Sequence, residues 1–156
     1  MLNFTAISLN ELKRFAENCY PSECCGILIG RNNGAEETVT IAYPVRNMTA
    51  GDNCRSFCID PLEILRSEIY AEQNNLEILG FFHSHPDNEA SASTEDIRHM
   101  ITGYFYPIIS VRNGKAAEIR CYQRADNNAV FEVPFKRREK NADNRLYCRN
   151  AAQLCE

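Results

Sequence analysis

Residues 76–96 have the sequence LEILGFFHSHPDNEASASTED, and two of the three histidines of the chain lie within it. Its first part, residues 76–82, is apolar and predicts a buried β-strand. That strand delivers His83 and His85 at its end, where a polar stretch begins. Because positions i and i+2 of a strand face the same side of a sheet, both imidazoles can point at one place. The stretch therefore predicts converging histidines beside a loop, where functional sites are commonly built.

The polar residues that follow offer a carboxylate to this pair. Residues 86–92 predict a loop, and Ser93 is expected to cap a helix with Asp96 in its first turn. Two histidines and one carboxylate match the ligand set of catalytic zinc, in which a fourth position is left for water. Asp96 is the favoured carboxylate. Asp87 is the alternative, although it would require the chain to double back tightly after the second histidine. His99 is expected to be an ordinary histidine on the helix surface.

Helix and strand signals are interleaved along the rest of the chain. Strands are separated by turn signals, among them Asn33-Gly34 and Asn113-Gly114. This interleaving predicts one α+β (mixed α/β) domain. The remaining strands are expected at residues 26–29, 39–43, 57–59, 108–111, 117–121 and 130–133, with a loop over residues 44–54.

Two helices have recognisable start signals. Ser8 followed by Glu11 predicts a capping box that opens a helix ending before Pro21. Asp60 followed by Pro61 predicts an N-cap and a first helical residue, and this second helix is expected to end near residue 74. The large apolar residues of the second helix share one face: Leu62, Leu65 and Ile69.

Composition and charge exclude several classes of protein. The 156 residues are 44% hydrophobic and 24% charged, which is typical of a globular domain and not of a disordered chain. No apolar run approaches the ~20 residues of a membrane-spanning helix. The net charge of −4 argues against a general nucleic-acid binder. Residues 1–135 hold 11 basic and 18 acidic residues, whereas residues 136–156 hold 6 and 3, so a basic tail follows an acidic body.

The eight cysteines are expected to be free thiols. The first residues, MLNFT, lack the basic start and long apolar stretch of a signal peptide, so a reducing cytoplasmic location is expected. No C-x-x-C pair occurs, and Cys54 and Cys58 are the nearest approach to a metal-binding pair. Because Cys58 lies in a strand-like run, these two are not expected to bind metal.

An acidic residue far upstream, Glu23, completes a recognisable pattern. Taken alone it would be a solvated glutamate between a helix and a strand. Together with the later residues it resembles the JAMM (MPN+, Mov34/PAD-1) zinc metallopeptidase motif, of the compact prokaryotic type. The matching set is Glu23-x-Cys25-Gly26 before an apolar strand, then His83-x-His85, seven residues, Ser93, two residues and Asp96.

The resemblance implies a fold and a set of roles. The fold is a cytidine-deaminase-like JAMM/MPN domain over residues 1–135, with a central mixed β-sheet flanked by helices, followed by a basic C-terminal tail over residues 136–156. The implied cofactor is Zn²⁺. The implied roles are zinc ligation by His83, His85 and Asp96, general base catalysis by Glu23, and a hydrogen bond from Ser93 to the oxyanion.

The resemblance also implies an activity. It is that of a zinc-dependent metallopeptidase or isopeptidase, similar to a deubiquitinase. The implied substrate is a ubiquitin-like or sulfur-carrier protein that ends in Gly-Gly and is cut after its last glycine, because glycines let the backbone approach the metal closely. Enzymes of this kind accompany E1-like enzymes, in sulfur transfer or in bacterial ubiquitin-like conjugation systems that serve antiviral defence. Neither a nucleic acid nor a membrane is an expected partner.

Two other functions compete with this one. A nucleobase deaminase would carry His-x-Glu and a downstream Pro-Cys-x-x-Cys, and the chain has neither. A non-catalytic MPN-type protein-binding module would tolerate the loss of Glu23 or Asp96. Both residues are present, which favours the enzyme.

Overall fold

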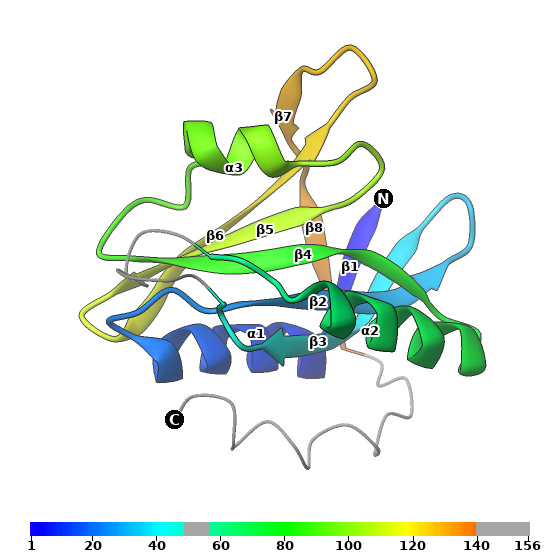
Figure 1. Ribbon diagram of the computed structural model, residues 1–156, viewed down its shortest axis with the longest axis horizontal. Coiled ribbons are helices and arrows are strands. Elements are labelled where there is room, and N and C mark those ends of the chain that lie inside the picture. Colours follow the sequence, from blue (N-terminus) through cyan, green and yellow to red (C-terminus); the bar gives the residue numbers. More distant parts are fainter. Residues whose placement is uncertain (49–56, 140–156) are drawn as a thin grey trace.

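The chain folds around a mixed sheet whose central strand carries both histidines. The structure is a computed structural model, and it describes residues 1–48 and 57–139. Within these residues the sheet has the strand order β7-β6-β5-β4-β2-β3-β1-β8. The mixed α/β class predicted from the sequence is confirmed (Figure 1). In chain order the elements are β1 (Leu2–Thr5), α1 (Ala6–Cys19), β2 (Cys25–Asn32), β3 (Glu37–Val45), α2 (Pro61–Gln73), β4 (Glu77–Pro86), α3 (Thr94–His99), β5 (Tyr106–Arg112), β6 (Lys115–Arg124), β7 (Val130–Glu132) and β8 (Phe135–Arg138).

The sheet separates two apolar layers, and alternate residues of β2 enter each of them. Leu28 packs in one layer with Leu12 and Phe15 of α1. Ile27 packs in the other layer with Ala71 of α2. All five side chains are buried, so α1 and α2 each cover one face of the sheet. Among the described residues no helix is long and apolar enough to cross a membrane.

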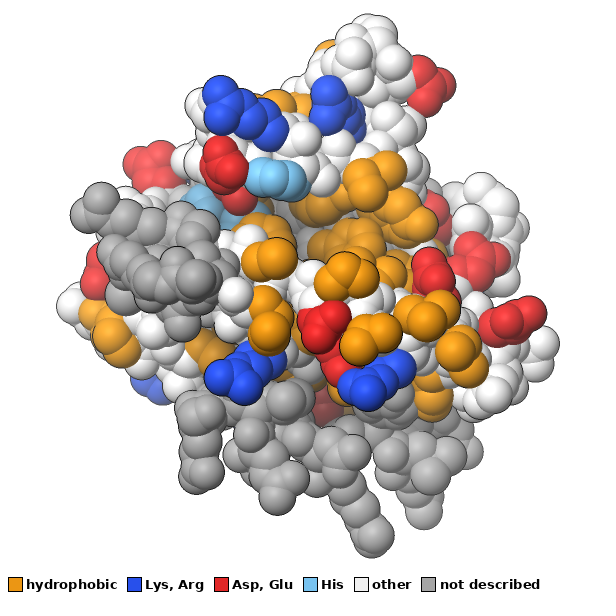
Figure 2. Space-filling view, in the orientation of Figure 1, with side chains coloured by type: hydrophobic (Ala, Val, Ile, Leu, Met, Phe, Trp, Pro, Cys, Tyr) orange, Lys and Arg blue, Asp and Glu red, His pale blue; other side chains and the backbone are white. Residues whose placement is uncertain are grey.

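Helix α2 turns three of its large apolar side chains away from the sheet. Leu62, Leu65 and Ile69 are 58%, 51% and 47% exposed. The residues that α2 buries are small, namely Ser67 and Ala71. Apolar side chains consequently gather on the surface over α2 and toward α3 (Figure 2).

One predicted helix start is wrong and the other is confirmed. Helix α1 begins at Ala6, and its N-cap is Thr5, whose Oγ1 accepts a hydrogen bond from the backbone N–H of Ser8 at 3.1 Å. Ser8 therefore lies inside the first turn, where its hydroxyl donates to the Val39 carbonyl at 2.9 Å. Helix α2 begins at Pro61 as predicted, and the Asp60 side chain caps it.

The strands differ from the prediction at three places. Residues 57–60 form no strand, so the one predicted over residues 57–59 is wrong. The sequence did not indicate β1 or β8, which pair with each other in parallel. Pairing of β8 continues to Arg138, so the sheet extends past residue 135. In the segment expected to be a loop, β3 continues to Val45 and residues 49–54 lie outside the described residues, as do residues 140–156 of the basic tail.

The neighbours of β4 fix where the histidines lie. β4 pairs antiparallel with β2, with Cys25 opposite His83. It pairs in parallel with β5, with His85 beside Ser110. The histidines therefore lie near the end of a strand that has a neighbour on each side, on the face that α2 covers.

Candidate metal centre

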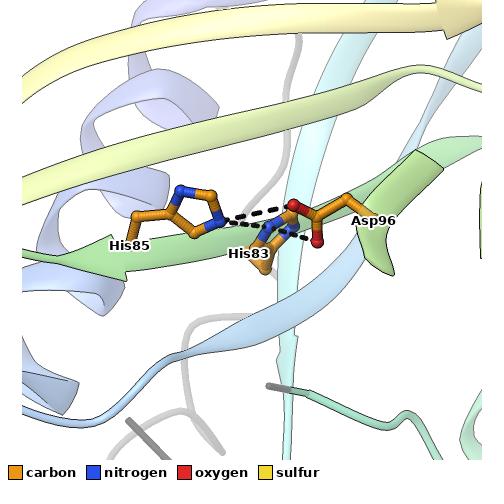
Figure 3. Close-up of side chains that lie close together, drawn as sticks. All are labelled: His83, His85 and Asp96. Carbon is orange, nitrogen blue, oxygen red and sulfur yellow. Dashed lines mark hydrogen bonds and ion pairs between the residues drawn. The ribbon is translucent and has the colours of Figure 1, made fainter. Parts of the chain in front are cut away.

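Three side chains from β4 and α3 converge at the end of the sheet. The Nε2 atoms of His83 and His85 lie 3.0 Å apart. The carboxylate of Asp96 lies 3.1 Å from His83 Nε2 and 3.5 Å from His85 Nε2. Figure 3 shows Asp96 reaching from α3 toward both rings. One ligand atom from each of the three residues falls within 4.8 Å of the others, so the group could hold a metal ion.

The orientation of His85 is fixed by a backbone carbonyl. Its Nδ1 lies 2.8 Å from the Glu89 carbonyl oxygen. A carbonyl oxygen only accepts hydrogen bonds, so this contact places a ring proton on Nδ1, and in the neutral ring Nε2 then carries the lone pair. Nε2 is the atom that faces His83 and Asp96. Metal-binding histidines typically have this arrangement.

His83 is oriented by packing instead. It is 1% exposed. The Phe57 ring stacks on its imidazole, with ring centroids 4.4 Å apart and planes 22° apart. Within the described residues its Nδ1 has no hydrogen-bond partner. Phe57 thus covers one face of the imidazole, and the Nε2 atom of that ring points toward His85 and Asp96.

A capping box at the start of α3 positions Asp96. Its Oδ2 accepts hydrogen bonds from the backbone N–H of Ser93 at 2.7 Å and from the Ser93 hydroxyl at 2.6 Å. The Ser93 Oγ in turn accepts from the Asp96 N–H at 3.1 Å. The helix predicted to begin at Ser93 is therefore present, and the Ser93 hydroxyl proton is directed at Asp96.

Burial and mutual hydrogen bonds shift the pKa values of all three residues. Burial alone would raise the pKa of Asp96, but the hydrogen bonds from His83 and His85 outweigh it and lower that pKa well below its ordinary value. Burial lowers the pKa of His83, and pairing with Asp96 offsets this only in part. Burial also opposes protonation of His85, but its hydrogen bonds to Asp96 and the Glu89 carbonyl raise its pKa. The carboxylate is therefore ionised at neutral pH, as a metal ligand must be.

Glu23 approaches the group from the segment just before the neighbouring strand β2. Cys24 and Ser84 exchange hydrogen bonds, from Cys24 N–H to Ser84 Oγ at 2.9 Å and from Ser84 N–H to the Cys24 carbonyl at 3.0 Å. The preceding residue, Glu23, is 7% exposed and lines the same cavity as His85. Its charge contributes to the raised pKa of His85. The glutamate is thus a buried carboxylate beside the metal group and not a solvated one.

The group opens into a cavity of about 970 Å³. One wall is apolar and includes Phe81, Tyr106 and Ile101. The polar part of the lining includes Glu89 and Glu95. A polypeptide with both apolar and polar contacts fits such a lining.

The remaining candidates are accounted for by other contacts. The Asp87 carboxylate accepts hydrogen bonds from the Tyr20 hydroxyl at 2.8 Å and the Asn113 N–H at 3.2 Å, so it belongs to the loop and not to the metal group. The His99 side chain is 70% exposed and lies 3.8 Å from a Glu95 carboxylate oxygen, as expected of a helix-surface residue. Cys54 lies outside the described residues, while Cys58 is exposed and lines the cavity.

Two contributors were not identified from the sequence. The Glu89 carbonyl belongs to the backbone and leaves no residue-type signal. The sequence predicts a strand at Phe57, just before the helix cap at Asp60, and gives no sign of a contact with the histidine pair. The stacking on His83 depends on a contact between residues 26 positions apart, which local patterns do not report.

The donor set fits a zinc ion. Zinc accepts imidazole nitrogen and carboxylate oxygen, and catalytic sites use three protein ligands with one side left open. Here the two Nε2 atoms and Asp96 converge in the lining of a cavity, and His85 already has the required tautomer. Without a metal, Nε2 of His85 faces Nε2 of His83 at 3.0 Å, so at most one of these two nitrogens can donate while the other accepts.

Comparisons with known proteins agree with this geometry. The sequence profile described as prokaryotic homologs of the JAB domain matches residues 5–125. A desampylase of Haloferax volcanii is 34% identical over 91 residues, which cover 58% of this chain and 63% of that protein. A desampylase of Pyrococcus furiosus is 30% identical over 111 residues, covering 71% of this chain and 73% of that protein.

Solved structures show the same fold. A protein from Desulfitobacterium hafniense superposes with a TM-score of 0.79 at 29% identity, covering 90% of this chain and 95% of that chain. A JAB1/MPN domain protein from Archaeoglobus fulgidus superposes with a TM-score of 0.55 at 15% identity, covering 89% and 98%. The family predicted from the spaced motif is confirmed: the chain belongs to the prokaryotic homologs of the JAB domain.

Proposed function

We propose that this protein is a zinc-dependent JAMM-type isopeptidase that cuts after the C-terminal glycine of a ubiquitin-like or sulfur-carrier protein. The observation that carries the proposal is the convergence of His83, His85 and Asp96 in the lining of one cavity that the buried residue Glu23 also lines. Two relatives of the chain are desampylases, and this supports the substrate class.

In this proposal His83 and His85 bind zinc through Nε2, and Asp96 binds it through a carboxylate oxygen. Zinc, when bound, lowers the pKa of a water molecule and polarises a carbonyl group. The carboxylate of Glu23 accepts the proton that the attacking water releases. Glu23 then delivers this proton to the nitrogen of the leaving amine. Its burial beside the metal group keeps bulk water from competing for that proton.

Ser93 has two possible contributions. As an oxyanion donor, its hydroxyl would form a hydrogen bond to the substrate oxygen as the carbonyl becomes tetrahedral. The same hydroxyl donates to Asp96 Oδ2 at 2.6 Å, so the oxyanion role requires that it turn away from Asp96. The backbone N–H of Ser93 also donates to Asp96 Oδ2. This second hydrogen bond would keep Asp96 in place while the Ser93 hydroxyl rotates away.

Features around the cavity support a protein substrate. The exposed row on α2, formed by Leu62, Leu65 and Ile69, offers an apolar surface beside the cavity wall that contains Ile64. An exposed apolar surface of this extent is larger than one peptide side chain can cover. It is the kind of surface on which a folded protein domain docks. The acidic body of residues 1–135 would suit a basic patch on that domain and would increase the association rate. An E1-like enzyme that activates the same carrier is the proposed pathway partner.

The test is cleavage of ubiquitin-like fusions that end in Gly-Gly-X, compared with fusions in which the last glycine is leucine. We expect the glycine fusions to be cut after the last glycine and the leucine fusions to be spared. Equal cleavage of both would indicate a general peptidase. If zinc-loaded protein binds the fusions but cuts none, it is a non-catalytic binding module.

A further inference from the structure

Helix α3 carries Asp96, yet it does not bury an apolar face. It has six residues, and none of them is buried. Only its flanks are covered, at Ala90 before it and Met100 after it. Apolar packing of α3 therefore cannot explain why the carboxylate lies at the two histidines.

Polar side chains of β5 and β6 hold the loop that precedes α3. The Ser110 hydroxyl donates to the Asn88 carbonyl at 2.6 Å. The Tyr122 hydroxyl donates to the Ala90 carbonyl at 3.0 Å. The carbonyl between these two belongs to Glu89, and it is the one that accepts from His85 Nδ1. The two hydroxyls thus hold the backbone on both sides of the group that sets the His85 tautomer.

The same strands hold the chain after α3. Arg124 Nη1 donates to the Met100 carbonyl at 2.9 Å, at the carboxyl end of the helix. The next backbone N–H, of Ile101, donates to the Tyr106 hydroxyl at 2.7 Å. A cation at this end of a helix also interacts favourably with the helix dipole. Both ends of the α3 segment are consequently attached to the β5–β6 hairpin.

Strand register explains why these groups lie together. Ser110 is the pairing partner of His85, so both side chains leave the same face of the sheet. Tyr106 pairs with Tyr122, and Arg124 follows Tyr122 by two residues, which places its side chain on that face as well. One hairpin therefore presents its polar side chains to the segment between His85 and Ile101.

We propose that Ser110, Tyr122 and Arg124 are positioning residues for the metal centre: the two hydroxyls hold the Glu89 carbonyl against His85, and the guanidinium holds the helix that carries Asp96. The inference rests on the metal-binding part of the proposed function. Outer-shell partners of metal ligands typically change affinity or activity 10–100-fold when they are removed. These three residues do not hydrogen-bond to the metal ligands through their side chains. They hold the backbone carbonyls on either side of Glu89 and at the end of α3.

The first experiment measures zinc affinity by competition with a chelator. Tyr122→Phe removes one hydroxyl from a half-buried ring, and we expect it to weaken zinc binding about tenfold, the lower end of that range. Arg124→Met should have a similar effect through Asp96, and Arg124→Lys should restore part of the affinity. Tyr43→Phe is the matched control, because that hydroxyl donates to Glu63 on α2, 3.3 Å away. Ser110→Ala has its own control in Ser67→Ala, which removes the hydroxyl of a buried serine on α2.

The second experiment uses metal-free protein and nitrogen-15 NMR of the imidazole rings. In the unchanged protein we expect the His85 proton on Nδ1, protected from exchange by the Glu89 carbonyl. In Tyr122→Phe and Ser110→Ala we expect a mixture of tautomers and faster exchange, with urea unfolding still cooperative. In Tyr43→Phe the ring signals should not change.

The inference is overturned if Tyr122→Phe keeps both the zinc affinity and the tautomer of the unchanged protein. It is also overturned if Tyr43→Phe loses zinc to the same degree, because the effect would then be general destabilisation. Neither readout involves substrate. A protein that cleaves no fusion but shows the Tyr122→Phe effects would contradict the proposed function and leave this inference standing.

Discussion

Cys25 on β2 lies opposite His83 on β4, and this antiparallel pairing joins two motif segments that are almost sixty residues apart in sequence. Hydrogen bonds between Cys24 and Ser84 continue the pairing by one residue. The next residues outward are Glu23 and His85. Ordinary strand register is thus what brings the general base candidate to the metal group.

Metal content should depend on His83, His85 and Asp96 and on no other histidine. We expect one zinc per chain in protein purified without added zinc, and its loss in His83→Ala, His85→Ala and Asp96→Asn, because each removes one of three converging ligand atoms. Elemental analysis of purified protein is the measurement. His99→Ala is the control and should keep its zinc, since that side chain is 70% exposed on α3. Metal that stays well below one per chain after zinc is supplied would contradict the site.

Glu23 should separate catalysis from metal binding. We expect Glu23→Gln to lower turnover by roughly 10²–10⁴-fold, the usual contribution of a general acid–base group, while zinc stays bound. Turnover and zinc content are measured on the same preparation. Glu17→Gln is the control, because Glu17 is a hydrogen-bonded glutamate on α1, where it accepts from the Ala116 N–H at 3.0 Å. Near-normal turnover in Glu23→Gln would rule out the assignment.

Ser93 should show which of its two contributions is larger. As an oxyanion donor, its removal in Ser93→Ala should lower kcat by roughly 10²–10³-fold with zinc affinity retained. As a cap, its removal should weaken zinc binding and cost about 1 kcal/mol of helix stability. We expect the kcat effect to dominate, because the Ser93 backbone N–H still holds Asp96. Zinc lost in proportion to activity would show that Ser93 only positions Asp96.

Gly26, in the motif segment, should tolerate no side chain. A Cβ at this position would lie 2.3 Å from the Tyr43 carbonyl oxygen and 2.4 Å from the Phe82 ring. Overpacking of this kind costs about 1–3 kcal/mol, so Gly26→Ala should lower the midpoint of urea unfolding. Gly34→Ala has no neighbouring atom within 4 Å, and its loss should be limited to the strain of a positive φ. Equal midpoints for the two variants would contradict the packing argument.

Cysteine reactivity should follow burial. Burial raises the pKa of Cys25 to about 12, and that of Cys121 likewise to about 12. A thiol with such a pKa is ionised in about one molecule in ten thousand at pH 8, and only the thiolate reacts. Iodoacetamide followed by mass spectrometry should therefore label the exposed Cys58 and leave Cys25 and Cys121 unlabelled in folded protein. Early labelling of Cys25 would show that the β2–β4 pairing opens readily.

Periodicity and caps in the sequence were sufficient for the elements that pack locally. The strand ending in His83 and His85, the helix capped by Asp60 and the hairpin around Asn113-Gly114 are all present. β1 and β8 could not be predicted, because each has four residues and their pairing joins opposite ends of the sequence. Ser8 and Thr5 both carry a side chain that can cap a helix, and the choice between them depends on β1 ending at Thr5.

The candidate site was predictable for a different reason. Two histidines at i and i+2 of a strand, and a carboxylate in the first turn of the next helix, are visible as local patterns. Glu23 and the role of Ser93 followed only from the resemblance of the spaced set to the JAMM motif. The supports of the site left no comparable signal. The Glu89 carbonyl, the Ser110 and Tyr122 hydroxyls and the Phe57 ring act through tertiary contacts, which a single sequence does not encode as a local pattern.

The attachment of α3 by its ends has a consequence for local unfolding. A helix that buries no apolar side chain of its own can separate from the fold without breaking the apolar layers, so its opening costs less free energy than global unfolding. Amide hydrogens of α3, such as that of Ile97 bonded to the Ser93 carbonyl at 3.0 Å, should exchange with deuterium well before those of β4. Asp96 therefore lies on an element that can open locally, while the two histidines lie on a strand that is paired on both sides.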